Sequence, residues 1–100
     1  MIKILIIDDE PIIREGLRRT MDWERLNCSL VGEAENGIEA IEKIKCLQPD
    51  IIVTDIMMPG LNGLDLTKYI KENYPFIKII FLTGYNDFTF AQQAIKAWCF

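Results

Sequence analysis

Short runs of apolar residues limit most strongly the folds open to this chain. Ile2 to Ile7 and Ile51 to Val53 are apolar almost without a polar break, and Ile77 to Leu82 is apolar around Lys78. Strands that are buried on both faces have this pattern, and such strands belong to parallel sheets covered by helices on both sides. A shorter strand is predicted at Ser29 to Ala34, between the first two runs.

Segments of helical length separate the predicted strands. Pro11 suits the first turn of a first helix, where no amide donor is needed. The apolar residues that follow lie four positions apart on one helical face: Ile13, Leu17 and Met21. Asn36-Gly37 predicts a turn into a second helix, which Gln48-Pro49 ends. The inward face of this second helix is predicted to consist of Ile38, Ile41 and Ile44.

Two more helices complete the pattern. The third is predicted over Leu64 to Asn73, because Pro75 disfavours helical geometry at Tyr74. Asn86 or Asp87 can cap a fourth. The shared face of this fourth helix is predicted to consist of Phe88, Ala91, Ile95 and Trp98. The order βαβαβαβα with right-handed crossovers predicts an α/β fold, a doubly wound parallel sheet with helices on both sides.

Composition excludes several classes of protein. One hundred residues, half of them hydrophobic, fit a single small domain. A net charge of -4 argues against a nucleic-acid-binding surface, which needs clustered Lys and Arg. The nearest basic cluster, formed by Arg14, Arg18 and Arg19, is predicted to be a solvated helix face. No signal-peptide core or membrane span is present, so the chain is expected to be cytoplasmic.

The chain has no histidine, and its three cysteines stand far apart. Zinc sites built on histidine, Ser-His-Asp triads and an internal phosphohistidine are therefore excluded. Cys28, Cys46 and Cys99 lack the CxxC spacing of metal or redox sites, which predicts buried or half-buried thiols in a reducing compartment. Chemistry must come from carboxylates, hydroxyls, amines, the backbone or a bound ion.

Acidic residues stand at the ends of two predicted strands. Asp8 and Asp9 end the first strand, and Asp55 ends the third. Ligands of open parallel sheets bind outside the carboxyl ends of the strands, so the three carboxylates converge if these strands are neighbours. Like charges at such a distance raise one another's pKa unless a cation neutralises them. A hard divalent ion with oxygen ligands is the natural solution, and Mg²⁺ suits a site that keeps several waters. Alternatively, each aspartate only caps a helix or faces solvent.

Thr83 ends the fourth predicted strand and precedes Gly84. A hydroxyl at that place can donate to a phosphoryl oxygen, and glycine permits close approach of the backbone. Threonine at a strand end is common by itself. Its interest lies in the match with the two strand ends that carry the three aspartates.

With these residues in view, the chain resembles a known family. The segments that carry the resemblance are Asp8-Asp9-Glu10, Asp50 to Gly60, Asn62-Gly63 and Leu82-Thr83-Gly84. Together they are similar to the receiver domains of two-component response regulators, and they span essentially the whole chain. Three further segments resemble receivers that precede an AraC-type DNA-binding domain: Asp22-Trp23, Gly32 to Gly37 and Gly84 to Phe88.

The resemblance implies a flavodoxin-like receiver fold over residues 1–100 and a role for each matching residue. Asp55 would be the phospho-acceptor, taking a phosphoryl group from the phosphohistidine of a sensor histidine kinase. Asp8, Asp9, Asp55 and the backbone carbonyl of Met57 would bind Mg²⁺, and the Thr83 hydroxyl would hydrogen-bond the phosphoryl group and move on activation. Such metal-clamped transfer relies on positioning and charge neutralisation. DNA would be contacted only through an output domain outside these residues, and no membrane partner is implied.

The chain departs from the family pattern after its fourth predicted helix. The family's fifth strand and fifth helix, with a lysine that pairs with the phosphoryl group, have no counterpart before Phe100. Two explanations stand: a C-terminally truncated piece of a longer regulator, or a naturally short protein. Because an open sheet edge and apolar patches recruit partners, self-association through the fourth strand or fourth helix is expected. Trp98, where similar receivers have a small residue, fits either core packing or such a contact.

Three functions compete. The first is a signalling switch, not a conventional enzyme, in which phosphorylation of Asp55 alters a surface that a partner or output domain reads. The second is a hydrolase with an aspartyl-phosphate intermediate, but such enzymes usually need a second acid where this chain has Met57. The third is a receiver-like interaction or dimerisation module that is not phosphorylated, which the missing lysine favours.

Overall fold

Four parallel strands form the framework of the molecule in its computed structural model, which describes residues 1–55 and 63–82. The elements follow in the order β1 (Ile2–Ile7), α1 (Pro11–Thr20), β2 (Cys28–Ala34), α2 (Gly37–Leu47), β3 (Ile51–Asp55), α3 (Gly63–Asn73) and β4 (Lys78–Leu82). The predicted boundaries of these elements agree to within one residue, except that β3 continues beyond Val53 to Asp55. The predicted fourth helix, with its face from Phe88 to Trp98, lies outside the described residues.

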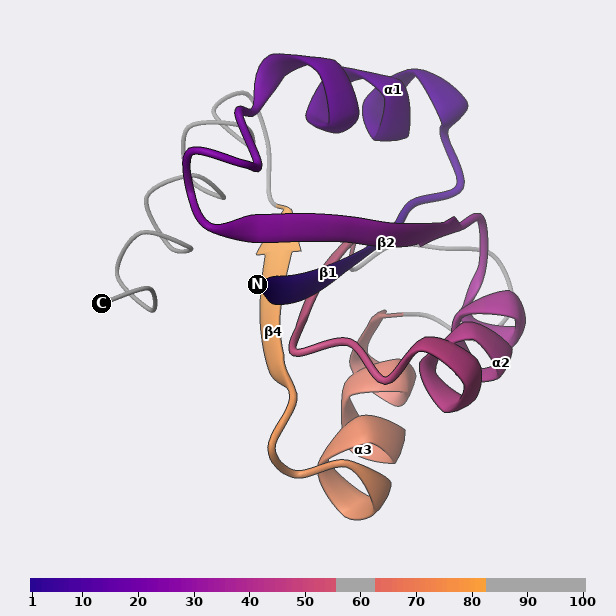
Figure 1. Cartoon of the computed structure of the whole chain (residues 1–100). Coiled ribbons are helices and arrows are strands. Elements are labelled where there is room, and N and C mark those ends of the chain that lie inside the picture. Colours follow the sequence, from indigo (N-terminus) through magenta and orange to yellow (C-terminus); the bar gives the residue numbers. More distant parts are fainter. Residues whose placement is uncertain (56–62, 83–100) are drawn as a thin grey trace.

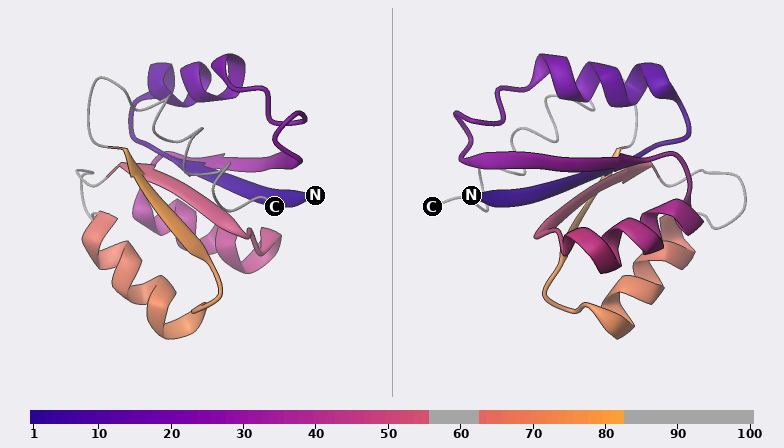
Figure 2. Two further views of the ribbon diagram at one scale, coloured as in Figure 1. Left: turned by 90° about the vertical axis from the view of Figure 1, so that its left-hand side faces the viewer. Right: turned by 45° about the vertical axis from the view of Figure 1, so that its right-hand side comes forward.

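The strands lie in the order β2-β1-β3-β4, each parallel to its neighbour. Helix α1 covers one face of the sheet, whereas α2 and α3 cover the other (Figure 1 and Figure 2). This doubly wound arrangement confirms the predicted α/β, flavodoxin-like fold class. It also makes β1 and β3 neighbours, which is the condition for their acidic ends to converge.

Each face of the sheet has its own core, and the inner strands contribute to both. We call the first the α1-side core; its fully or largely buried members are Ile4, Ile6, Leu17, Met21, Trp23, Leu26, Cys28, Ile51, Val53 and Ile80. The second is the α2/α3-side core, formed by Leu5, Ile7, Ala34, Ala40, Ile44, Ile52, Leu66, Ile70 and Ile77. Side chains alternate between the faces of a strand, so the four consecutive apolar residues Ile4 to Ile7 of β1 supply two residues to each core.

A shift of register in β2 separates its two halves. Ile4 of β1 pairs with Leu30, but the next residue, Leu5, pairs with Gly32, so Val31 is an extra residue in β2. One inserted residue moves every later side chain of the strand to the opposite face relative to an uninterrupted alternation. The side chains of β2 that follow Val31 therefore lie on the faces of the sheet opposite to those that a simple alternation predicts.

The consequences of this bulge appear at the end of β2. Glu33 faces α1, where it forms ion pairs, and Ala34 packs in the α2/α3-side core. Gly32 lies beneath α2, and a Cβ atom built on it would be 2.8 Å from the Leu47 Cδ1 atom. The absence of a side chain at this position lets α2 approach the sheet closely.

Local signals set the helix ends as predicted. Pro11 occupies the first turn of α1. The side-chain oxygen of Asn36 accepts a hydrogen bond from the Glu39 N–H at 2.8 Å and so caps α2. Gln48 ends that helix with a left-handed φ of 47°.

The predicted inward face of α2 is wrong at Ile38, whose side chain is 68% exposed. The buried positions are Gly37, Ala40 and Ile44, while Ile41 packs at the edge of the core. A spacing of three residues falls short of a full turn, so a series of such steps drifts around the helix. The face centred on Ala40 and Ile44 therefore leaves Ile38 outside, although Ile41 still touches the core.

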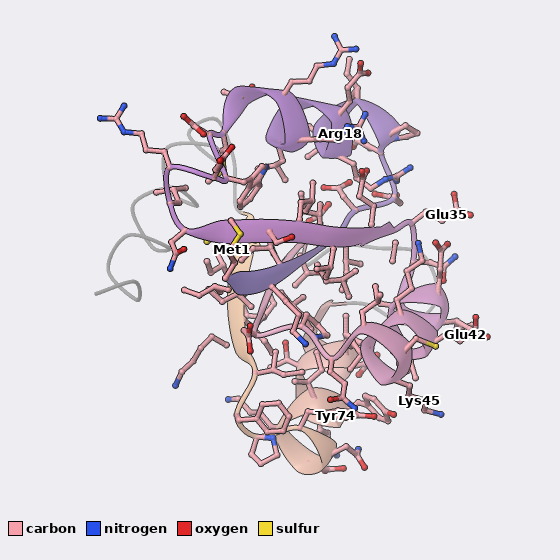
Figure 3. All side chains as sticks on the ribbon, viewed as in Figure 1. Met1, Arg18, Glu35, Glu42, Lys45 and Tyr74 are labelled. Carbon is pink, nitrogen blue, oxygen red and sulfur yellow. The ribbon has the colours of Figure 1, made fainter. Side chains whose placement is uncertain are left out.

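Two surface predictions also need correction. Arg14 is not solvated: its side chain is only 16% exposed, whereas those of Arg18 and Arg19 are 47% and 76% exposed. Figure 3 labels Arg18 on α1, and its side chain contacts Glu33 of β2. Cys28 is buried as expected, but Cys46 is exposed, and Cys99 lies outside the described residues. None of the described helices has the length and apolar character needed to cross a membrane.

Candidate functional site at the carboxyl ends of the strands

Three aspartates meet where β1 and β3 end. Asp8 and Asp9 directly follow β1, and Asp55 is the last residue of β3. The two strands pair in parallel with Ile7 opposite Thr54, so their carboxyl ends lie side by side. One carboxylate oxygen from each aspartate lies within 4.8 Å of the other two. The structure thus brings together the three carboxylates that the sequence singled out.

Asp8 is the most firmly held of the three. Its backbone N–H donates to the Ala34 carbonyl at 3.0 Å, which joins the end of β1 to the end of β2. Its carboxylate Oδ1 accepts the Glu10 N–H at 2.8 Å, and its carbonyl oxygen accepts the Arg14 Nη1 at 2.5 Å. The side chain is buried, while those of Asp9 and Asp55 are half-buried. The cluster therefore has one fixed, inner carboxylate and two that face outward.

The electrostatics of the cluster favour a cation. Burial, more than any other cause, raises the pKa of Asp8 from 3.8 to about 6, against the lowering effect of the Glu10 N–H. The neighbouring charges of Asp55, Asp9 and Glu10 raise it further. A group that resists ionisation because of burial and like charges gains when a positive ion arrives. The site is therefore costly to keep fully ionised without a counter-charge.

The donor set fits Mg²⁺. Carboxylate oxygens are the ligands of hard divalent cations, and Mg²⁺ keeps several waters when it binds to a few carboxylates. Asp9 and Asp55 are half-exposed, so water can reach both carboxylates. The predicted fourth ligand, the Met57 carbonyl, and the predicted hydroxyl of Thr83 lie outside the described residues.

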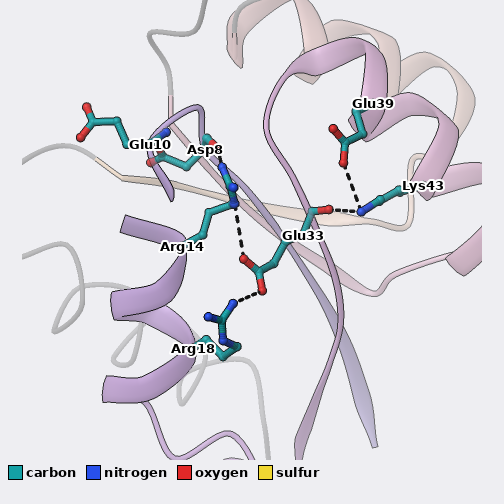
Figure 4. A network of polar contacts seen from close by, with 7 residues as sticks. All are labelled: Asp8, Glu10, Arg14, Arg18, Glu33, Glu39 and Lys43. Atoms are coloured by element: carbon teal, nitrogen blue, oxygen red, sulfur yellow. Dashed lines mark hydrogen bonds and ion pairs between the residues drawn. The ribbon is translucent and has the colours of Figure 1, made fainter. Parts of the chain in front are cut away.

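Sequence reasoning missed that Arg14 contacts the site and that Glu33 holds Arg14 in place. The Arg14 Nε lies 3.4 Å from Glu33 Oε1, and the Arg18 Nη1 lies 2.5 Å from Glu33 Oε2 (Figure 4). Arg14 thereby joins Glu33 to the backbone of Asp8. The signal in the sequence was the run of arginines on α1, but its partner Glu33 faces α1 only because of the bulge at Val31.

Known proteins similar to this chain carry the same arrangement of strands and helices. Residues 4–99 match the response regulator receiver domain family. This chain belongs to that family. The recognition drawn from the sequence motifs is thereby confirmed, and receiver domains are signalling switches that bind Mg²⁺ at an acidic pocket.

Individual relatives of this receiver domain include proteins named as transcriptional regulators. It is 46% identical over 96 residues to the uncharacterized transcriptional regulatory protein YesN of Bacillus subtilis (strain 168), covering 96% of this chain and 26% of YesN. The chain spans about a quarter of the length of YesN and less than half of the next two curated relatives it matches.

Two solved structures are similar in fold and sequence. The REC domain of AraT, a response regulator from Geobacillus stearothermophilus, has a TM-score of 0.78 and 46% identity, covering 94% of this chain and 73% of that one. A two-component transcriptional regulator AraC from Clostridium phytofermentans ISDg has a TM-score of 0.79 and 34% identity, covering 97% and 72%. These neighbours agree with the resemblance to receivers of AraC-type regulators.

Proposed function

We propose that this receiver domain is a phospho-accepting switch of a two-component system. In this proposal Asp55 takes a phosphoryl group from the phosphohistidine of a partner histidine kinase, and the change regulates a transcriptional output domain outside these residues. The observation that carries the proposal is the convergence of Asp8, Asp9 and Asp55, with one oxygen of each within 4.8 Å of the others. Family membership and the transcriptional regulators among its relatives support it.

The proposed transfer exchanges one bond for another. A carboxylate oxygen of Asp55 forms a new bond to phosphorus while the bond between phosphorus and the imidazole nitrogen of the donor breaks, and its electron pair stays on that nitrogen. Asp8, Asp9, Asp55 and the Met57 carbonyl would hold the cation. Mg²⁺, when bound, neutralises charge on the carboxylates and on the phosphoryl oxygens. The Thr83 hydroxyl donates a hydrogen bond to the phosphoryl group after transfer.

The assignment of Asp55 as acceptor follows from its exposure as well as from the family motif. The inner carboxylate, Asp8, is buried and already accepts a backbone N–H, so a donor imidazole cannot approach it in line. Asp9 and Asp55 are both half-exposed. Asp55 alone ends the inner strand β3, where its backbone pairs with Leu82 of β4.

Beryllofluoride with Mg²⁺ tests this proposal, because it mimics an aspartyl phosphate. We expect Mg²⁺-dependent changes in the amide NMR shifts of residues around Asp55 and Thr83 in the wild-type chain. Asp55→Asn should abolish the response to beryllofluoride, whereas Asp65→Asn, a matched change of an exposed aspartate on α3, should leave it intact. A wild-type response that survives in Asp55→Asn would contradict the proposed acceptor.

The unphosphorylated interaction module is the alternative outcome of the same experiment. It is supported if the wild-type chain binds Mg²⁺ but shows no response to beryllofluoride. Self-association through β4, the last strand of the described sheet, stays a prediction of either function.

A further inference from the structure

Arg14 connects the acidic cluster to a half-buried ion pair with Glu33 that the proposed phosphorylation does not use. Its Nη1 donates to the Asp8 carbonyl at 2.5 Å, and its Nε lies 3.4 Å from Glu33 Oε1. Figure 4 shows the guanidinium between the end of β1 and Glu33, with Arg18 on the far side of Glu33. The side chains of Arg14 and Glu33 are 16% and 25% exposed, so this pair is screened less by water than a surface ion pair.

The hydrogen bond from Arg14 to the Asp8 carbonyl orients the backbone between the Asp8 and Asp9 side chains. The Asp8 carbonyl belongs to the peptide plane that joins Asp8 to Asp9, and this plane is rigid. Fixing its oxygen fixes the direction in which the backbone enters Asp9. Because the Asp8 N–H is already held by the Ala34 carbonyl, both sides of Asp8 are anchored to β2 or α1.

Glu33 makes this arrangement compatible with a nearby cation. An arginine beside a cation site repels the ion, but here the guanidinium faces a carboxylate that balances its charge. Glu33 is itself held from three sides: Arg14 and Arg18 contact its carboxylate, and the Lys43 ammonium group of α2 donates to its carbonyl. The network thus ties α1, β2 and α2 to the end of β1.

We infer that Arg14 is a positioning residue for the cation site: anchored by Glu33, it fixes the Asp8–Asp9 peptide so that both carboxylates aim at one ion. This inference rests on the proposed function, since it assigns Asp8 and Asp9 to Mg²⁺. Arg14 has no contact with substrate or ion in this role. It acts only through the backbone that carries the ligands.

The sign of the change in Mg²⁺ affinity separates positioning from simple charge. Removing a positive charge beside a cation site strengthens cation binding if only Coulomb repulsion matters. Removing a group that orients ligands weakens binding, by roughly ten-fold or more for a supporting hydrogen bond behind a metal ligand. Arg14→Met removes both the charge and the hydrogen bonds, so the two roles predict opposite results.

The test is a titration of the ¹⁵N-labelled chain with MgCl₂ at constant ionic strength, followed by amide NMR shifts. We expect the Mg²⁺ dissociation constant of Arg14→Met to rise roughly ten-fold. Arg19→Met is the matched control, because Arg19 lies on the same helix but pairs with Glu15 and is 76% exposed, and its dissociation constant should stay within about two-fold of wild type because exposed charges are screened. Arg14→Lys, which keeps the charge and one donor, should lie between.

The outcomes separate the role of Arg14 from the proposed function. If wild type shows no Mg²⁺ binding, the proposed function fails and the role of Arg14 fails with it. If wild type binds and Arg14→Met binds equally well or more tightly, the positioning role alone is overturned. Should Arg14→Met not fold, as judged by its amide spectrum, Arg14→Lys decides: affinity equal to wild type contradicts positioning, and weaker affinity supports it.

Discussion

Asp8 links the chemistry of the site to the stability of the fold. Its pKa rises from 3.8 to about 6 on folding, first because it is buried and then because Asp55, Asp9 and Glu10 carry like charges. The folded chain therefore holds this proton more tightly than the unfolded chain does. Asp8 contributes stability that is fully present below a pH of about 4 and is lost as the pH rises through about 6.

Asp8→Asn should therefore stabilise the metal-free chain at neutral pH. Asparagine keeps an oxygen that can accept the Glu10 N–H but cannot ionise. One pKa unit corresponds to about 1.4 kcal/mol, so the gain in the free energy of unfolding at pH 7.5 should be at most about 3 kcal/mol and should vanish near pH 4. Urea unfolding in EDTA across this range measures it, with Asp22→Asn, an exposed aspartate, as the control for loss of charge. A gain that does not depend on pH would contradict this linkage.

At the scale of single elements, α2 shows how a helix face is chosen. Ile44 is fully buried in the α2/α3-side core, while Ile38 on the same helix is 68% exposed. We expect Ile44→Ala to lower the free energy of unfolding by about 2–5 kcal/mol. Ile38→Ala removes the same atoms from an exposed position and should change it by less than about 0.5 kcal/mol. Urea unfolding of both variants measures the difference, and equal losses would show that the assigned face is wrong.

The strands and helix ends could be predicted from the sequence because local chemistry decides them. Apart from Lys3, the run Ile2–Ile7 is apolar on both faces, which is typical of a strand inside a parallel sheet. Pro11 and Asn36 mark helix starts through their own backbone and side-chain chemistry. The aspartates at the ends of β1 and β3 follow from the same strand assignments. Each of these features could be predicted because it depends only on residues that are close to it in the chain.

The supporting network could not be predicted, because it depends on a shift between strands. Without the extra residue Val31, the uninterrupted alternation of β2 would turn Glu33 toward α2, away from Arg14. Arginines on a short helix fit a solvated face equally well by spacing alone. The pairing of Ile6 with Glu33 places this half-buried glutamate opposite Arg14.

At the scale of the whole molecule, the two cores share one set of strands. Neighbouring residues of β1 alternate between the α1-side core and the α2/α3-side core, and those of β3 do the same. Neither core can lose its strands without exposing the other. The site lies at the ends of these same two strands, so an ion bound there contacts the part of the sheet common to both cores.

Binding of Mg²⁺ should therefore stabilise the described fold as one cooperative unit. At a free Mg²⁺ concentration 100 times the dissociation constant, the free energy of unfolding should rise by about 2.7 kcal/mol if the unfolded chain does not bind. Trp23 fluorescence, measured with Trp98→Phe so that one tryptophan remains, reports the α1-side core, and far-UV circular dichroism reports all helices. Both urea midpoints should move by the same amount.

The controls for this prediction isolate the ion and the site. KCl at matched ionic strength should leave the midpoints nearly unchanged, because it screens charge without occupying an oxygen site for a divalent ion. Asp55→Asn should reduce the Mg²⁺-induced shift by removing the only carboxylate that β3 contributes to the cluster. If Mg²⁺ moves the circular dichroism midpoint but not that of Trp23, the two cores unfold separately and the shared strands do not couple them. Coincident shifts mean instead that a ligand at the strand ends acts on both layers of helices through β1 and β3.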